Sequence, residues 1–345
     1  MPGAKRLELN FDQILPYVGE YGRYQATLQA MFCFALIPMT FPTLIMYFAA
    51  LQPKWQCVPN QKECLLNGTV SASNNQRCNM TRSAWKYAEP DDYSIVTQFD
   101  IYCDKDWMIH ITTSIMFIGW VFGAIILGWV ADNYGRKIVL FPSMGVLLII
   151  GFLSAFSPNI SVFIVSRFIV GFFVPGTSVQ MFILISELVG TKYRAAAGIG
   201  IWAFFTLGLC IMGLKSYLVP RWSTLYIICH APYIIVLLFW WFTPESIRWL
   251  HSRGEIEKAM AILKKVASMN KKEIPDHVTL APPPKSENEG GVKPSDLFRT
   301  RDLTVKSSIQ GKSYLIYTTP LEESLGDMMI LQKKVNSTTP TFNKI

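Results

Sequence analysis

Between two long apolar segments the chain reads Gly128-Trp-Val-Ala-Asp-Asn-Tyr-Gly-Arg-Lys137. Each flanking segment is long enough to cross a bilayer, whose hydrocarbon core needs about 20 helical residues. A short charged stretch is what two antiparallel membrane helices need where the chain reverses outside the lipid. We therefore expect Gly128 and Gly135 to act as turn glycines. The alternative is an ordinary polar turn with no further role.

The composition supports a membrane protein. Of 345 residues, 51% are hydrophobic and only 16% are charged, and the apolar residues occur in long runs. A soluble domain rarely has this composition. Lipid offers no partner for free backbone groups, so helices are the expected spans. The sequence predicts an all-α polytopic membrane protein with six transmembrane helices, at Tyr24–Leu51, Trp107–Ala131, Ile138–Phe156, Ile160–Ile185, Ala195–Val219 and Thr224–Phe242.

Basic residues indicate the orientation of these helices. They cluster in alternate short loops and after the sixth span, which places those loops and both termini in the cytosol by the positive-inside rule. The predicted order is a cytosolic segment (1–23), the first span (24–51), a large extracellular loop (52–106), five further spans (107–242), a cytosolic helical and linker region (243–303) and a polar tail without a span (304–345). The location we expect is the plasma membrane.

Four of the seven cysteines lie in the loop at 52–106, and so do two N-glycosylation sequons. Both features are typical of an oxidising, extracellular compartment, so we expect two disulfides and glycans there. Three pairings are possible, and the sequence does not choose among them. No histidine lies in this loop, which makes a zinc site less favourable. The cysteines are Cys57, Cys64, Cys78 and Cys103, and the sequons begin at Asn67 and Asn79.

The pattern G-x-x-x-D-x-x-G-R-K at Gly128–Lys137 resembles the loop between the second and third helices of the major facilitator superfamily. The end of the large loop, Ser94–Asp104, resembles a segment of its organic cation/carnitine transporter family, as does Phe11-Asp12 near the N-terminus. The resemblance implies the N-terminal half of the major facilitator fold. It also implies transport of organic cations, or zwitterions such as carnitine, by alternating access.

Two further motifs resemble this superfamily at the inner ends of the helices. Glu187 and Arg194 have the spacing of its E-x6-R pattern, and Thr243–Leu250 resembles P-E-S-x-R-W-L. The resemblance implies an inner-gate charge cluster, since charges at a dry helix interface are costly unless they are paired. The alternative is a set of solvated loop charges. The expected members are Asp132, Arg136, Lys137, Glu187, Arg194, Glu245 and Arg248.

Arg167 is a base at membrane depth, where it should face the protein interior or a cavity. It either serves a substrate cavity or makes a structural bond to backbone carbonyls. Aromatic rings can hold quaternary ammonium ions by cation–π contact, although most aromatic residues of membrane helices serve packing. The candidate cavity residues are Arg167, Gln180, Trp202, Phe205 and Tyr217.

The spans stop at six, whereas the resembled fold has two six-helix halves. This chain would then require a second transporter half, or it would be a truncated or regulatory, non-transporting partner of full-length carriers. Transport of organic anions also stays open. No catalytic motif is present, so we expect no enzyme activity, cofactor, metal or nucleic-acid partner. The expected partners are membrane lipid and a small organic cation, zwitterion or anion.

Overall fold

The structure of the chain, a computed structural model, describes residues 7–58, 76–190 and 192–283. In this part of the chain six helical segments are long and apolar enough to cross a membrane. The prediction of an all-α, six-span membrane protein is confirmed. Five spans are single helices: α2 (Arg23–Ala49), α4 (Trp107–Tyr134), α5 (Arg136–Ser154), α6 (Ile160–Leu188) and α7 (Arg194–Leu218).

The sixth span is interrupted, which the sequence analysis did not anticipate. It consists of α8 (Trp222–His230), α9 (Tyr233–Leu237) and the 3-10 turn η5 (Leu238–Trp241). The interruption falls at Pro232, which has no backbone N–H for the helical ladder. Proline alone does not explain the difference, because Pro38 and Pro42 in α2, Pro142 in α5 and Pro175 in α6 all lie inside uninterrupted helices.

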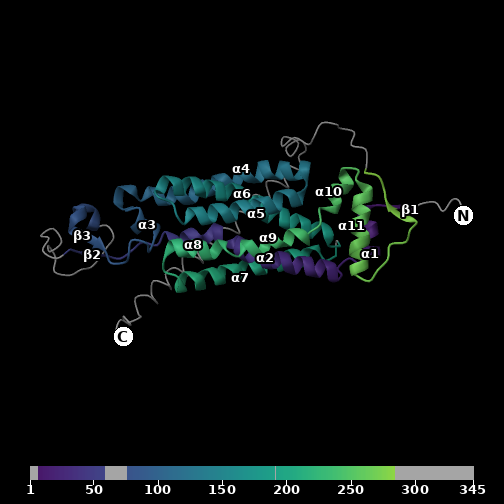
Figure 1. Cartoon of the computed structure of the whole chain (residues 1–345), viewed down its shortest axis with the longest axis horizontal. Helices are drawn as coiled ribbons and strands as arrows, with labels where there is room; N and C mark the ends of the chain where they lie inside the picture. Colours follow the sequence, from purple (N-terminus) through teal and green to yellow (C-terminus); the bar gives the residue numbers. More distant parts are fainter. Residues whose placement is uncertain (1–6, 59–75, 191, 284–345) are drawn as a thin grey trace, which may run out of the picture. The chain divides into compact units, whose positions relative to one another are not determined.

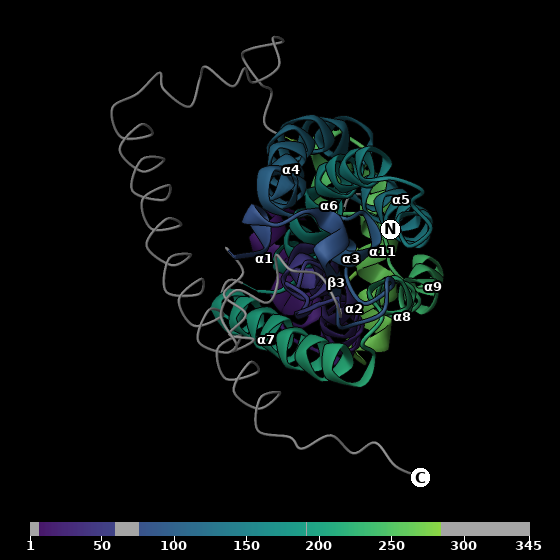
Figure 2. The ribbon, with the colours of Figure 1, turned by 90° about the vertical axis from the view of Figure 1, so that its left-hand side faces the viewer.

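The helices pack around α2 and α6, which are the most buried spans, whereas most of α4 and α7 stays exposed (Figure 2). The crossing of α4 with α6 is especially close. A Cβ atom on Gly123 would lie 1.9 Å from the carbonyl oxygen of Phe172, so only glycine fits there. Small residues at such crossings let membrane helices approach closely.

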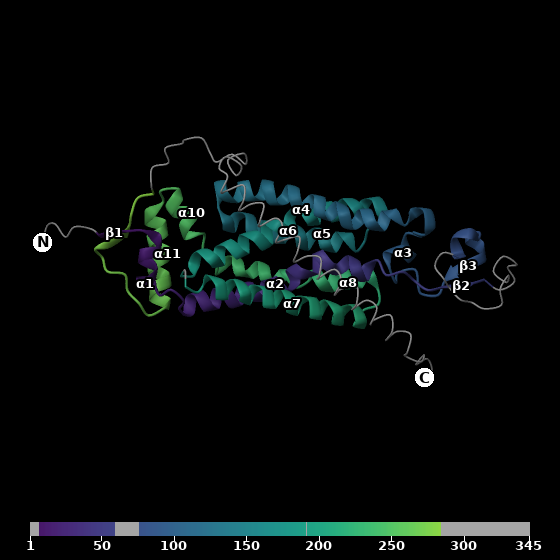
Figure 3. The same ribbon diagram turned by 180° about the vertical axis from the view of Figure 1, so that it is seen from behind.

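A group of short elements, which we call the cap, covers one end of the bundle (Figures 1 and 3). It contains α1 (Phe11–Val18), α10 (Ile247–Ser252), α11 (Ile256–Met269) and a two-stranded parallel sheet of β1 (Leu7–Leu9) and β4 (Val278–Leu280). The amphipathic face of α1 is buried. Asn270 joins the parts, because its amide donates to the Val18 carbonyl oxygen and the Gln25 side chain and accepts from the Tyr24 N–H.

The loop after α2 lies at the opposite end of the bundle (Figure 1). Its described part holds β2 (Trp55–Cys57) paired antiparallel with β3 (Trp85–Tyr87), the helix α3 (Ile95–Gln98) and three 3-10 turns. These turns are η2 (Gln76–Asn79), η3 (Arg82–Ala84) and η4 (Cys103–Lys105). A disulfide joins Cys78 to Cys103, and Cys57 is also disulfide-bonded.

Some predictions fall outside the described residues. These are the roles of Cys64 and Asn67, the linker from residue 284 to 303, and the polar tail from residue 304 onward. The division of the chain at residues 23, 51, 106, 242 and 303 stays a prediction. Asn79, the other sequon, is exposed on η2, where a glycan could be attached.

Candidate functional site: a charge cluster at the cap end of the bundle

The turn between α4 and α5 consists of Gly135 alone, which has a φ of 114°. A Cβ atom there would lie 2.6 Å from a carboxylate oxygen of Glu245, so glycine is required by both conformation and space. The prediction for Gly128 is wrong. That residue lies within α4, and a Cβ atom on it would meet nothing within 4 Å. The helical path of α4 simply continues through it.

Glu245 holds the start of α5. Its Oε1 accepts hydrogen bonds from the backbone N–H groups of Arg136 (2.8 Å), Lys137 (3.0 Å) and Ser246 (2.9 Å). The first N–H groups of a helix have no partner inside the helix, and a carboxylate there also complements the helix dipole. The acid of the P-E-S motif therefore positions the neighbouring charged side chains by fixing their backbone.

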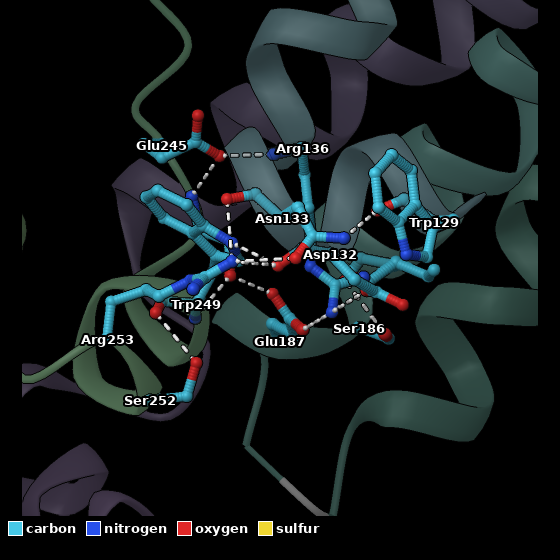
Figure 4. A network of polar contacts seen from close by, with 12 residues as sticks. Trp129, Asp132, Asn133, Arg136, Ser186, Glu187, Glu245, Trp249, Ser252 and Arg253 are labelled. Carbon is cyan, nitrogen blue, oxygen red and sulfur yellow. Dashed lines mark hydrogen bonds and ion pairs between the residues drawn. The ribbon is translucent and has the colours of Figure 1, made fainter. Parts of the chain in front are cut away.

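Arg136 and Glu187 form the least exposed ion pair of the described residues. Their side chains are 16% and 12% exposed, and Nη2 lies 3.4 Å from Oε1. The other Glu187 oxygen accepts a hydrogen bond from the Ser246 hydroxyl. Asp132 lies 3.6 Å from the same Arg136 nitrogen but is 71% exposed. The pair thus links α5 to α6, while the Asp132 carboxylate remains accessible (Figure 4).

Trp249 of α10, together with Arg253 directly after that helix, caps the end of α4. The Trp249 indole donates to the Asp132 carbonyl oxygen (2.9 Å), and the Arg253 guanidinium donates to the carbonyl oxygens of Asp132 (3.1 Å) and Asn133 (2.7 Å) (Figure 4). The last carbonyl groups of a helix lack partners within it, and basic side chains stabilise them. We did not predict this role of Trp249 and Arg253 from the sequence. The tryptophan inside the P-E-S-x-R-W-L motif was the available signal.

Two of the expected members form a second group around an acid that the sequence analysis did not include. Asp12 of α1 lies 3.2 Å from Arg194 and 2.7 Å from Arg248. Arg194 also donates to the carbonyl oxygen of Ser186 at 3.0 Å, near the end of α6. The E-x6-R spacing therefore brings Arg194 to the end of the helix that carries Glu187, but its ionic partner is Asp12. The motif Phe11-Asp12 was the only sequence signal for this contact.

Lys137 donates its backbone N–H to Glu245, and the charge of the same acid acts on its ammonium group. Its ammonium group lies 4.7 Å from the centroid of the Trp240 ring. No salt bridge to it occurs among the described residues. Its role in the inner-gate cluster stays a prediction, and its ammonium group packs against the sixth span.

The candidate cavity residues do not come together. Arg167 is 1% exposed, and its guanidinium donates to the Pro42 carbonyl oxygen (2.9 Å) and to the Met116 sulfur (2.7 Å), which is the structural bonding that we had left open. Gln180 is also buried, and its Oε1 has no hydrogen-bond partner among the described residues. At about 1.5 Å per helical residue, it lies about 20 Å from Arg167 along α6.

On α7, Trp202 and Phe205 form an edge-to-face pair with centroids 5.5 Å apart. Trp202 is 57% exposed, and Tyr217 is 61% exposed near the far end of the same helix. These aromatic rings lie on α7, most of which is exposed in the described part of the chain. They therefore form an exposed aromatic surface. Their role in a substrate cavity stays a prediction.

The loop at the opposite end is held by charge and aromatic contacts. The Arg82 guanidinium pairs with Asp100 at 3.1 Å and lies 4.3 Å from the centroid of the Trp85 ring. Burial, followed by the Asp100 charge, raises the pKa of Tyr87 to about 12. Among the described residues, no group of three His, Cys, Asp or Glu side chains is placed to hold a metal ion.

Residues 63–305 match the sequence profile of the family described as "Sugar (and other) transporter". The chain is 32% identical over 312 residues to rat solute carrier family 22 member 3, covering 76% of this chain and 56% of that protein. It is 30% identical over 291 residues to Arabidopsis thaliana organic cation/carnitine transporter 4 (84% and 53%). It is 32% identical over 295 residues to rabbit organic anion transporter 3 (79% and 54%).

The chain therefore spans about half the length of the curated relatives that it matches. Among solved structures, the partially occluded, inward-open xylose transporter XylE of E. coli superposes with a TM-score of 0.50 at 17% identity, over 72% of this chain and 56% of XylE. That likeness bears on the fold. The chain belongs to the sugar (and other) transporter family within the major facilitator superfamily, and it is related to the organic cation/carnitine transporters.

Proposed function

We propose that the chain provides the N-terminal half of a plasma-membrane transporter that moves organic cations, or zwitterions such as carnitine, by alternating access. The cap end would face the cytosol, and the disulfide-bonded loop with Asn67 and Asn79 would be extracellular. In this scheme a second transporter half supplies the other side of the substrate pathway. The division of the chain predicted from the sequence is part of this proposal.

The observation that supports this function is the unequal exposure of the charge cluster. Arg136 and Glu187 are nearly buried and link two helices of the same half, so their bond can persist through a rigid-body movement. Asp132 extends from the same turn and is 71% exposed. We propose that the buried pair braces this half and that Asp132 is the residue which contacts the second half when the cytosolic side closes.

The substrate class rests on the relatives and on the aromatic face of α7. Proteins named as organic cation/carnitine transporters are among the relatives. The exposed Trp202 and its neighbour Phe205 offer rings to a quaternary ammonium group, each contact being worth about 0.5–2 kcal/mol. A related protein named as an organic anion transporter supports the anion alternative. The uptake experiment must therefore include both organic cations and organic anions.

The test is uptake of labelled tetraethylammonium, carnitine and an aromatic organic anion into cells that express the chain. The chain is expressed alone and together with the C-terminal portion of rat solute carrier family 22 member 3 that its match does not cover. Glycosylation of Asn67 and Asn79 reports that the loop has crossed the membrane, and surface biotinylation reports delivery to the surface. The proposal is supported if the two parts together take up the cation or carnitine faster than either part alone. If they take up only the anion, the substrate class is organic anions instead.

A second candidate function is regulation of a full-length carrier. The exposed, apolar α4 and α7 favour it, because they offer a surface that such a carrier could bind without solute movement. Expression of the chain beside an intact rat relative separates the two functions. A fall in the relative's uptake, with no transport by the chain and its complementing portion, would favour regulation.

A further inference from the structure

The side chain of Lys137 defines a second feature of the cap end, separate from the charge cluster. Its ammonium group lies over the Trp240 ring, 4.7 Å from the centroid, and that ring packs edge-on against Phe141 with centroids 5.4 Å apart. The next two residues are strongly exposed, Trp241 at 74% and Phe242 at 68%. Exposed aromatic rings at the end of a span are typical of the membrane–water interface.

A second lysine contributes charge at the same place. Lys265 of α11 lies near enough to Lys137 for the two ammonium groups to repel each other. The acid that faces Lys137 is Glu245, whose Oε1 already accepts three backbone hydrogen bonds. Two positive charges near a single carboxylate leave a local excess of positive charge.

The other described lysines of α11 differ from Lys265. Lys258 pairs with Glu255 at 2.8 Å, and Lys264 lies 3.9 Å from a carboxylate oxygen of Asp276. Lys265 is exposed and has no salt bridge among the described residues. Lys265 is therefore the lysine of α11 whose charge has no acidic partner within the described part of the chain.

We propose that Lys137, Lys265 and Trp240 bind the phosphate headgroup of an acidic phospholipid. The ammonium groups supply charge-assisted hydrogen bonds to phosphate oxygens, while the exposed rings of Trp241 and Phe242 contact the acyl chains. These rings favour a lipid over a soluble phosphate, because a soluble anion would leave them unused. The proposal rests on the placement of this end at the cytosolic leaflet but not on transport.

The experiment titrates the purified full-length chain in detergent with short-chain phosphatidylserine, phosphatidylcholine and glycerophosphoserine, which has the same headgroup without acyl chains. Each lysine near an anionic surface is worth about 1 kcal/mol, or about fivefold in affinity. We expect phosphatidylserine to bind most tightly, Lys137→Gln and Lys265→Gln each to weaken it about fivefold, and the double variant to weaken it about 30-fold.

Lys264→Gln is the matched control, since that lysine lies on the same helix and has Asp276 as its partner. Lys137→Arg should retain binding, which separates loss of charge from misfolding. Equal weakening by Lys264→Gln and Lys265→Gln, or equal affinity for phosphatidylcholine, would overturn the proposal. If glycerophosphoserine bound as tightly as phosphatidylserine, the site would recognise a soluble phosphate and the lipid proposal would be wrong. Transport is not measured, so a failed uptake experiment leaves this result intact.

Discussion

Replacing Glu187 by glutamine tests the energetics of the cluster. The substitution keeps the shape of the side chain and its ability to accept from the Ser246 hydroxyl, but it removes the charge that lies 3.4 Å from Arg136. Removing one partner of a buried pair costs about 3–5 kcal/mol. Asp132 still lies 3.6 Å from the guanidinium, so we expect about 2 kcal/mol.

The measurement is the thermal unfolding of the full chain in detergent, followed by tryptophan fluorescence at one heating rate because such unfolding is often irreversible. For a chain of this length, a loss of about 2 kcal/mol corresponds to a Tm lower by roughly 3 °C. The matched control is Asp132→Asn, which removes the 71% exposed acid beside the same arginine and should cost less than about 1 kcal/mol. If Asp132→Asn lowered the Tm as much as Glu187→Gln does, the proposal that the buried Arg136–Glu187 pair stabilises this half would be refuted.

Three further predictions concern the other contacts. Asp12→Asn should lower the Tm by a few degrees at low salt and by less at high salt, because the side chain is 55% exposed and its two ion pairs are screened. Gly123→Ala should lower the Tm strongly, since the new methyl group would meet the Phe172 carbonyl oxygen. Gly128→Ala, on the same helix with open space around it, should raise the Tm slightly, and a loss as large as that of Gly123→Ala would contradict the packing. Burial raises the pKa of Tyr87 to about 12, so its contribution to stability is complete below its unfolded pKa of about 10 and is lost as the pH rises toward 12. Near-ultraviolet circular dichroism of the full chain should show this loss, and Tyr87→Phe should reduce it.

The sequence was sufficient to predict the spans because each is a long apolar run bounded by charges. It was less informative about where a helix turns. A glycine near a charged stretch indicates a turn, but Gly128 is compatible with a continuous helix, and only Gly135 has the positive φ and the contact with Glu245 that require glycine. The interruption of the sixth span at Pro232 could not have been predicted from proline alone, because α2, α5 and α6 continue through internal prolines.

The charge cluster was predictable in membership but not in pairing. Motif spacing places Arg136, Glu187 and Glu245 near one end of the bundle, and these three do meet. Spacing does not tell where a long side chain ends, so the position of the Lys137 ammonium group over Trp240 could not be predicted. The role of Asp12 depends on α1 folding back over the bundle, which is a tertiary contact that local patterns do not specify.

The most direct test of the proposed inner gate is the uptake of labelled tetraethylammonium by cells that express the chain together with the complementing C-terminal portion of the rat relative. The comparison is between the wild-type chain and Asp132→Asn at equal surface amounts. If the Asp132 carboxylate contacts the second half, the substitution should leave the Tm of the chain nearly unchanged and reduce uptake to the level of cells without the chain. Wild-type uptake by Asp132→Asn would contradict the account.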